Sequence, residues 1–210
     1  MTVCTIGIDG AWGGLGWAVG TESGPVYAGH FTAGAKTWRQ VALRSGLEEI
    51  EHAVADVETL LGEHDLGPRV VVERPPWQYS RSGSQVKTAY GLGTVVGGVL
   101  FWGTREGWAY PWEVPPSTTT TPGGREVVGW RSHWRITIKG RDPKKIAAVR
   151  LVQANGWGRF FGELDTTWPG KDKPWPAGDL AEAILIQVFG ARRADLAPRG
   201  PRVARRARNG

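Results

Sequence analysis

The first twenty residues constrain the fold most, because they combine two apolar runs with a glycine-rich turn. The run Val3–Ile8 alternates in polarity and ends at Asp9; glycines follow, and then the apolar run Trp17–Val19. This pattern predicts a strand, a tight turn and a second strand. Asp9 would then end a buried strand, where a carboxylate needs a compensating charge such as a metal ion. Asp-Gly is also a common turn dipeptide without any such role.

Three further acids occur in comparable positions. The β-branched run Val70–Val72 ends in Glu73, and the segment around Asp179 and Glu182 is typical of a helix with both acids on one face. Each acid alone has an ordinary explanation, since helix N-termini favour carboxylates. Together they could hold two divalent cations about 4 Å apart, as in phosphodiester hydrolysis. If they do crowd one site, we expect mutual repulsion to raise the pKa of some of them.

The order of these motifs resembles that of the Holliday-junction resolvases of the RuvC type, above all their phage-encoded branch. The likeness rests on Ile6–Asp9, Val71–Glu73 and the late helix, and it extends from about Thr2 to about Phe189. It implies an α/β, ribonuclease-H-like fold, with a mixed five-stranded sheet flanked by helices, over residues 1–195. Residues 196–210 would form a basic, disordered tail.

The resemblance also implies an activity and a set of site residues. Two Mg²⁺ or Mn²⁺ ions per active site would be held by Asp9, Glu73, Asp179 and Glu182. A homodimer would cut four-way junctions or other branched DNA during recombination, repair or phage DNA processing. Glu182 stands where some relatives have Asp, and either residue can ligate a metal.

The charge distribution favours a polyanionic partner. The chain has a formal net charge of +6, but residues 125–150 hold eight Lys or Arg against two acids, and residues 196–210 hold five Arg and no acid. The rest of the chain is therefore net acidic. Two basic segments beside an acidic body suit an enzyme that acts on nucleic acid. The alternative is that the basic residues only keep the surface soluble.

Candidate DNA contacts follow Glu73 and lie on both sides of the start of the helix expected from residue 142. Trp77, and secondly Tyr79, could stack on an unpaired base at a branch point. Trp77 could equally pack on the adjacent prolines. The basic candidates for phosphate contacts are Arg74, Lys87, Lys139, Arg141, Lys144 and Lys145.

Hydrophobic periodicity and the positions of Gly and Pro residues predict the remaining helices and strands. A third strand over 26–31 completes an antiparallel set. A helix over 38–61 has an apolar stripe formed by Val41, Leu43, Leu47, Ile50, Val54, Val57, Leu60 and Leu61. We expect a glycine-rich helix over 87–102, a strand over 108–114 and helices over 142–154 and 179–189. The insert 115–129, rich in Thr, Pro and Gly, departs from the resemblance and is expected to be mobile.

The single cysteine limits the chemistry. Because Cys4 is the single cysteine of the sequence, the chain can form neither an internal disulfide nor a cysteine zinc site. The position of Cys4 in the first strand predicts that it is a core residue. No apolar run approaches roughly 18 residues, and the N-terminus lacks a signal-peptide pattern. We therefore expect no membrane association and a location in the cytoplasm of a bacterium or phage-infected cell.

Two other functions are compatible with parts of the sequence. Asp9-Gly10 and the following glycines resemble the first phosphate loop of actin-like and sugar-kinase-like ATPases, but no convincing second loop is present. A non-catalytic nucleic-acid-binding protein on the same fold is the other alternative, and retention of all four acids argues against it.

The arginine-rich tail should add affinity for DNA without specificity. Deleting residues 196–210, with its five arginines, should weaken binding to all DNAs alike. The salt dependence should flatten by roughly 0.9 in log–log slope for each phosphate that the tail neutralises. Binding of four-way junctions and duplexes over a range of salt concentrations measures this. Loss of junction binding with unchanged duplex binding would contradict it.

Overall fold

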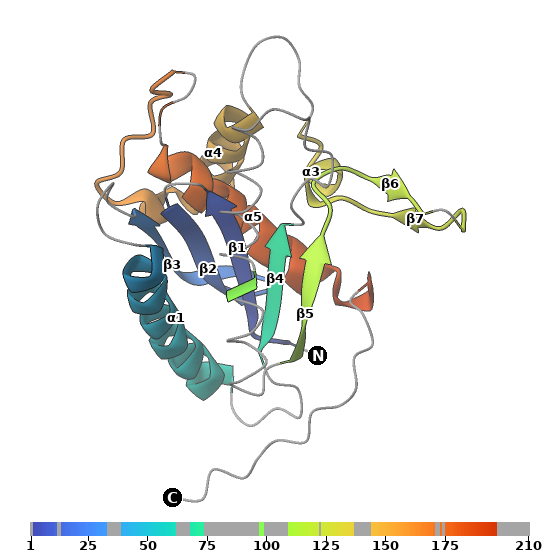
Figure 1. Cartoon of the computed structure of the whole chain (residues 1–210), viewed down its shortest axis with the longest axis horizontal. Coiled ribbons are helices and arrows are strands. Elements are labelled where there is room, and N and C mark those ends of the chain that lie inside the picture. Colours follow the sequence, from blue (N-terminus) through green and yellow to red (C-terminus); the bar gives the residue numbers. More distant parts are fainter. Residues whose placement is uncertain are drawn as a thin grey trace, which may run out of the picture.

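Five strands form one mixed sheet in the order β3-β2-β1-β4-β5 (Figure 1). The computed structural model describes residues 2–11, 14–32, 39–61, 68–73, 97–98, 109–121, 123–136, 144–170, 173 and 175–196. The strands are β1 (Thr5–Ala11), β2 (Gly14–Thr21), β3 (Gly24–Thr32), β4 (Arg69–Glu73) and β5 (Ala109–Val114). The first three are antiparallel neighbours, whereas β4 runs parallel to both β1 and β5. The predicted α/β fold with a mixed five-stranded sheet is confirmed.

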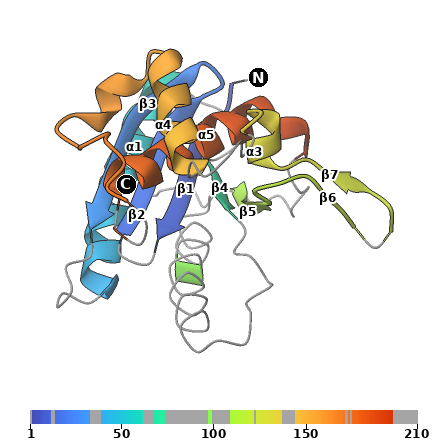
Figure 2. The same ribbon diagram turned by 90° about the horizontal axis from the view of Figure 1, so that it is seen from above.

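Helices cover both faces of this sheet (Figures 1 and 2). The helical segments are α1 (Arg39–Leu61), α3 (Trp130–His133), α4 (Lys144–Ala154) and α5 (Pro176–Arg192), with short 3-10 turns η1 (Gly158–Phe161) and η2 (Ala194–Leu196). Helix α1 packs on one face, and α5 lies across the other with α4 against it. Helix α5 begins almost one turn earlier than predicted, because Pro176 occupies its first turn, where a missing N–H costs nothing.

Alternation along β1 and β4 separates two cores. Ile6 and Ile8 of β1 pack in the cluster with α1, together with Val70 and Val72 of β4. Val71, between those two valines, belongs instead to the cluster with α5. Since successive side chains of a strand point to opposite faces, alternate residues of β1 and β4 are directed toward α5.

Helix α5 is buried along nearly its whole length, with every residue from Ala177 to Ala191 inside the protein. A helix that is apolar on most sides needs neighbours on most sides. Glycines allow the sheet to supply one of them at close range: a Cβ on Gly7 would overlap the backbone of Ala183 and Gln187. Gly16, which the sequence suggested as part of a turn, lies within β2, where its Cβ would overlap the backbone of Asp179.

The insert 115–129 contains a small hairpin that the sequence did not predict. Strands β6 (Thr119–Thr120) and β7 (Glu126–Val127) pair antiparallel and project from the rest of the chain (Figures 1 and 2). Leu60 was also misassigned to the apolar stripe of α1: it is 72% exposed, whereas Val57 is buried and Leu61 packs on the core. Cys4 is a core residue, as expected.

Several predicted features lie outside the described residues. These are most of the glycine-rich helix, of which only Gly97 and Gly98 are described and have helical backbone, the start of the helix at 142–143, and the tail beyond residue 196. Among the helices that the structure does describe, none has the length and apolar character needed to cross a membrane.

The close contact between β1 and α5 predicts a strong effect of a small change. Gly7→Ala should lower the free energy of unfolding by about 1–3 kcal/mol, because the added methyl group must push two packed backbones apart. Gly123→Ala is a suitable control, since among the described residues its Cβ would meet only the Thr121 hydroxyl, at 4.0 Å. Urea unfolding of both variants tests this, and similar losses in the two would contradict it.

Candidate active site

The register of the sheet places Asp9 beside Glu73. Ile8 of β1 is paired with Val72 of β4, so the next residue of each strand lies at the same edge of the parallel pair. Both carboxylates follow a residue that faces α1 and therefore face α5. The row continues in the other direction, because Asp9 is paired with Gly16 of β2 and Gly16 with His30 of β3.

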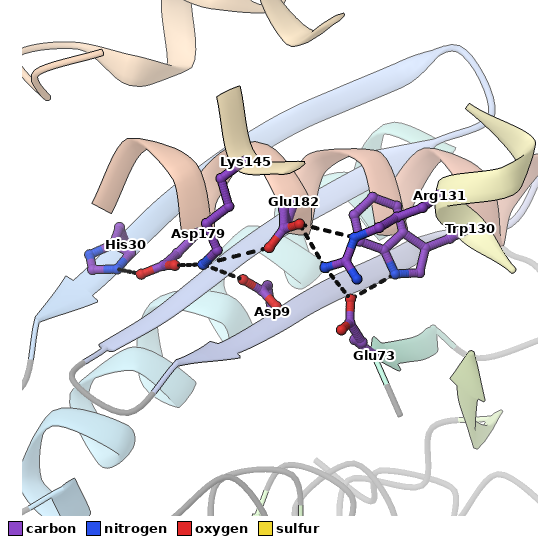
Figure 3. Close-up of polar contacts among 8 residues, drawn as sticks. All are labelled: Asp9, His30, Glu73, Trp130, Arg131, Lys145, Asp179 and Glu182. Carbon is purple, nitrogen blue, oxygen red and sulfur yellow. Dashed lines mark hydrogen bonds and ion pairs between the residues drawn. The ribbon is translucent and has the colours of Figure 1, made fainter. Parts of the chain in front are cut away.

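Helix α5 adds the other two acids above this row. Gly16 has no side chain, so the backbone at Asp179 lies directly against β2. Asp9, Asp179 and Glu182 are 6%, 5% and 1% exposed, which makes them part of the interior rather than of a solvated helix cap. The structure thus brings the four sequence-predicted acids to one face of the sheet (Figure 3).

Lys145 of α4 reaches into the group of acids (Figure 3). Its Nζ pairs with Asp179 Oδ1 and lies 3.6 Å from Asp9 Oδ2 and 3.5 Å from Glu182 Oε2. We expected this lysine to contact DNA phosphates. In this structure its amino group lies among three carboxylates, and the side chain is 31% exposed.

Arg131 and Trp130 of α3 hold the acids on the other side. Arg131 Nη2 lies 2.7 Å from Glu182 Oε1 and 3.0 Å from Glu73 Oε2. The indole N–H of Trp130 donates to Glu73 Oε2 at 2.8 Å. The guanidinium carbon of Arg131 lies 4.5 Å from the centroid of the Trp130 ring, so the two side chains stack while they bind the acids.

The insert positions α3. A helix of four residues has little stability of its own, so its place depends on external contacts. The backbone N–H groups of Trp130 and Arg131 donate to the carbonyls of Pro115 and Pro116 at 3.1 and 2.9 Å, and Thr118 N–H donates to Ser132 Oγ at 3.0 Å. The base of the hairpin therefore fixes the direction of the Arg131 side chain.

His30 completes the group at the β3 side. Its Nε2 lies 3.2 Å from Asp179 Oδ2, so an N–H there donates to the carboxylate. A Cβ on Gly14 would overlap the His30 ring, so this glycine leaves the space that the imidazole occupies. Asp179 is thus held from two sides, by His30 and by Lys145.

The environment shifts the pKa values of these acids in opposite directions. Burial, followed by the neighbouring carboxylates, raises the pKa of Asp9 well above its ordinary value, against the opposing effect of Lys145. Burial also raises the pKa of Glu73, although Arg131 opposes it. For Asp179 burial acts in the same direction, but the hydrogen bond from His30 and the charge of Lys145 outweigh it and lower the pKa. The expectation that crowding raises the pKa of some of these acids is confirmed for Asp9 and Glu73, with burial as the larger cause, whereas the pKa of Asp179 is lowered.

The donor chemistry fits a hard divalent cation, because carboxylate oxygens are the ligands that Mg²⁺ and Mn²⁺ prefer. In the described part of the chain, however, no three His, Cys, Asp or Glu side chains are arranged so that they could hold a metal ion. The carboxylates instead hold Lys145 and Arg131, whose own pKa values are raised by these ion pairs despite burial. Positive charge is therefore already present at the point where the sequence indicated a metal.

The other sequence-predicted site residues divide into two groups. Lys144 begins α4 and is half-buried. The remainder lie outside the described residues: Arg74, Trp77, Tyr79, Lys87, Lys139 and Arg141.

Sequence patterns did not identify His30, Trp130 and Arg131 as members of the site. Arg131 was counted in the basic segment 125–150 as part of a DNA-binding surface. His30 lies within a strand and belongs to no local motif. It comes close to the acids only because it is paired with Gly16 of the neighbouring strand.

Comparisons with known proteins support the fold. No protein-family model and no curated protein matches the sequence. The solved structure of T. thermophilus RuvC in complex with Holliday junction substrate is similar, with 17% identity, a TM-score of 0.51, and coverage of 93% of this chain and 98% of that chain. A Thermus thermophilus RuvC structure also matches, at 17% identity and a TM-score of 0.47, over 93% of this chain and 99% of that one. The first match confirms the expected RuvC-like, ribonuclease-H-like fold.

The opposite pKa shifts predict opposite effects of neutralising two neighbouring acids. In EDTA at neutral pH, Asp9→Asn should be as stable as the wild type or more stable, because the raised pKa shows that folding disfavours its charge. Asp179→Asn should lower the free energy of unfolding by about 1–3 kcal/mol, because it removes the ionised carboxylate that accepts from His30 and Lys145. The stability due to Asp179 should disappear as the pH falls through its lowered folded-state pKa, whereas protonation of Asp9 should favour folding. Thermal unfolding against pH tests both, and equal losses would contradict the assignment.

Proposed function

We propose that this chain is a metal-dependent, structure-specific DNA endonuclease that acts on Holliday junctions or other branched DNA. The observation that carries the proposal is the meeting of four carboxylates from β1, β4 and α5 on one face of a RuvC-like sheet. The nuclease domain would cover residues 1–195 and the basic tail residues 196–210.

Asp9, Glu73, Asp179 and Glu182 would hold two Mg²⁺ or Mn²⁺ ions. Bound ions of this kind activate a water molecule and stabilise the leaving oxygen of a phosphodiester. The chain's own contribution is to orient the ligands: His30 fixes Asp179, and the Trp130 indole fixes Glu73. Asp9, Asp179 and Glu182 are buried, and this burial would limit competition from bulk water for their oxygens.

The proposed DNA contacts are inferred from the sequence. Trp77 and Tyr79 would stack on bases at the branch point, and Arg74, Lys87, Lys139, Arg141, Lys144 and Lys145 would bind phosphates. A homodimer would present two sites to a four-way junction, and the protein would act in the cytoplasm of a bacterial or phage-infected cell. Support for branched DNA comes from the complex of the similar RuvC with a Holliday junction substrate.

A panel of labelled four-way junctions, forks, flaps and duplexes tests this function in Mg²⁺, Mn²⁺ or EDTA. The wild type should cut branched DNA only with a metal present. Asp9→Asn and Glu73→Gln should cut at least roughly 10²-fold more slowly, because each loses a charge needed to hold the ions. Both should retain junction binding, since neither side chain belongs to the proposed phosphate contacts.

Glu163→Gln provides a matched control, because Glu163 is an exposed acid outside the group around Asp9. It should cut at the wild-type rate. Near-wild-type cleavage by the purified Asp9→Asn variant would remove Asp9 from the site. Junction binding without cleavage in any metal would favour a non-catalytic DNA-binding protein.

A further inference from the structure

We infer that Lys145 and Arg131 are internal counterions that compete with divalent cations for the four carboxylates. The inference rests on the proposed metal site and concerns how that site is regulated. In the DNA-free protein these two side chains would hold the carboxylates together and keep metal affinity low. Metal entry would release them.

The two cations bridge carboxylates from different elements. Lys145 joins Asp9 of β1 to both acids of α5, and Arg131 joins Glu73 of β4 to Glu182. Glu182, only 1% exposed, binds both. Without these bridges, the buried carboxylates of Asp9, Asp179 and Glu182 and the partly buried one of Glu73 would face one another with little water to separate them, which is unfavourable in an interior of low dielectric constant.

The same oxygens would have to ligate a metal. Both carboxylate oxygens of Glu182 are in use, Oε1 by Arg131 and Oε2 by Lys145. One oxygen each of Asp9 and Glu73 is engaged as well, and both oxygens of Asp179 are in use, Oδ1 by Lys145 and Oδ2 by His30. A divalent ion that bound these acids would take over oxygens that the basic side chains now hold, and its charge would repel both. Metal binding and release of the two cations are therefore one coupled equilibrium.

Of the two basic side chains, Lys145 is the one that would leave the carboxylates first. Its side chain is 31% exposed, whereas that of Arg131 is 13% exposed and stacked on Trp130. A lysine has a flexible stem that can carry its amino group toward solvent. A DNA phosphate at the opening of the site would accept the released charge. Binding of DNA and metal would thus favour each other, and metal would bind weakly without DNA.

The test measures Mn²⁺ binding to the DNA-free protein by calorimetry and thermal unfolding in EDTA and in excess Mn²⁺. Lys145→Gln and Arg131→Gln should bind Mn²⁺ on the order of tenfold more tightly, because a competing charge is gone. Both should melt at a lower temperature than the wild type in EDTA and show a larger shift on addition of Mn²⁺. Lys145→Arg keeps the charge and should bind Mn²⁺ about as weakly as the wild type.

Arg150→Gln is the matched control, because it removes one positive charge from an exposed position of α4. Its Mn²⁺ affinity should stay close to that of the wild type, which separates local competition from a change in net charge. Unchanged or weaker Mn²⁺ binding by Lys145→Gln and Arg131→Gln would overturn the inference. If a variant does not fold in EDTA, Mn²⁺ should restore its folding, and failure to do so would also overturn it.

These results are independent of DNA cleavage. If the variants bind Mn²⁺ more tightly but the wild type cuts no branched DNA, the counterion inference is supported and the endonuclease proposal is rejected. Metal-dependent cleavage with unchanged Mn²⁺ affinity in both variants would support the endonuclease and reject the counterions.

Discussion

The backbone-to-backbone contact between α5 and the sheet determines both the core and the site. Gly7 and Gly16 allow the helix to lie against β1 and β2 without intervening side chains. The same contact brings Asp179 and Glu182 down to the level of Asp9. Had either glycine carried a side chain, the helix would have to lie farther from the sheet, and the acids of α5 would lose the positions from which they share a counterion.

Burial and charge compensation together shift the pKa values of Asp9, Glu73 and Asp179. Four carboxylates share two basic side chains, so full ionisation leaves an excess of negative charge in a buried space. Burial, together with this excess of negative charge, raises the pKa values of Asp9 and Glu73, while His30 and Lys145 keep the pKa of Asp179 low. Because removal of one partner from a buried ion pair exposes the other to the full desolvation cost, these residues behave as a unit.

Local patterns predicted what local structure determines. Apolar runs separated by glycines located β1 and β2, a β-branched run located β4, and helical spacing placed Asp179 and Glu182 on one face. The partners of the acids could not be found in this way, since His30 is 149 residues from Asp179 and Trp130 is 57 from Glu73. Arg131 depends in addition on the hairpin base, where Thr-rich sequence carries no periodic signal. The assignment of Leu60 to the apolar stripe was wrong for a simpler reason. Leu60 is next to Leu61, which packs on the core, and its own side chain is exposed to solvent.

Strand register makes part of the chain intolerant of changes in length. Asp9 and Glu73 face α5 because each follows a residue that faces α1. One residue added to or removed from β1 or β4 would reverse that direction and place a carboxylate in the apolar cluster around Ile50. Both residues of β6 are exposed, so a change of length in the hairpin would not turn a polar side chain into the core. Insertions and deletions among descendants of this chain should therefore collect at the hairpin tip and be absent from the two strands.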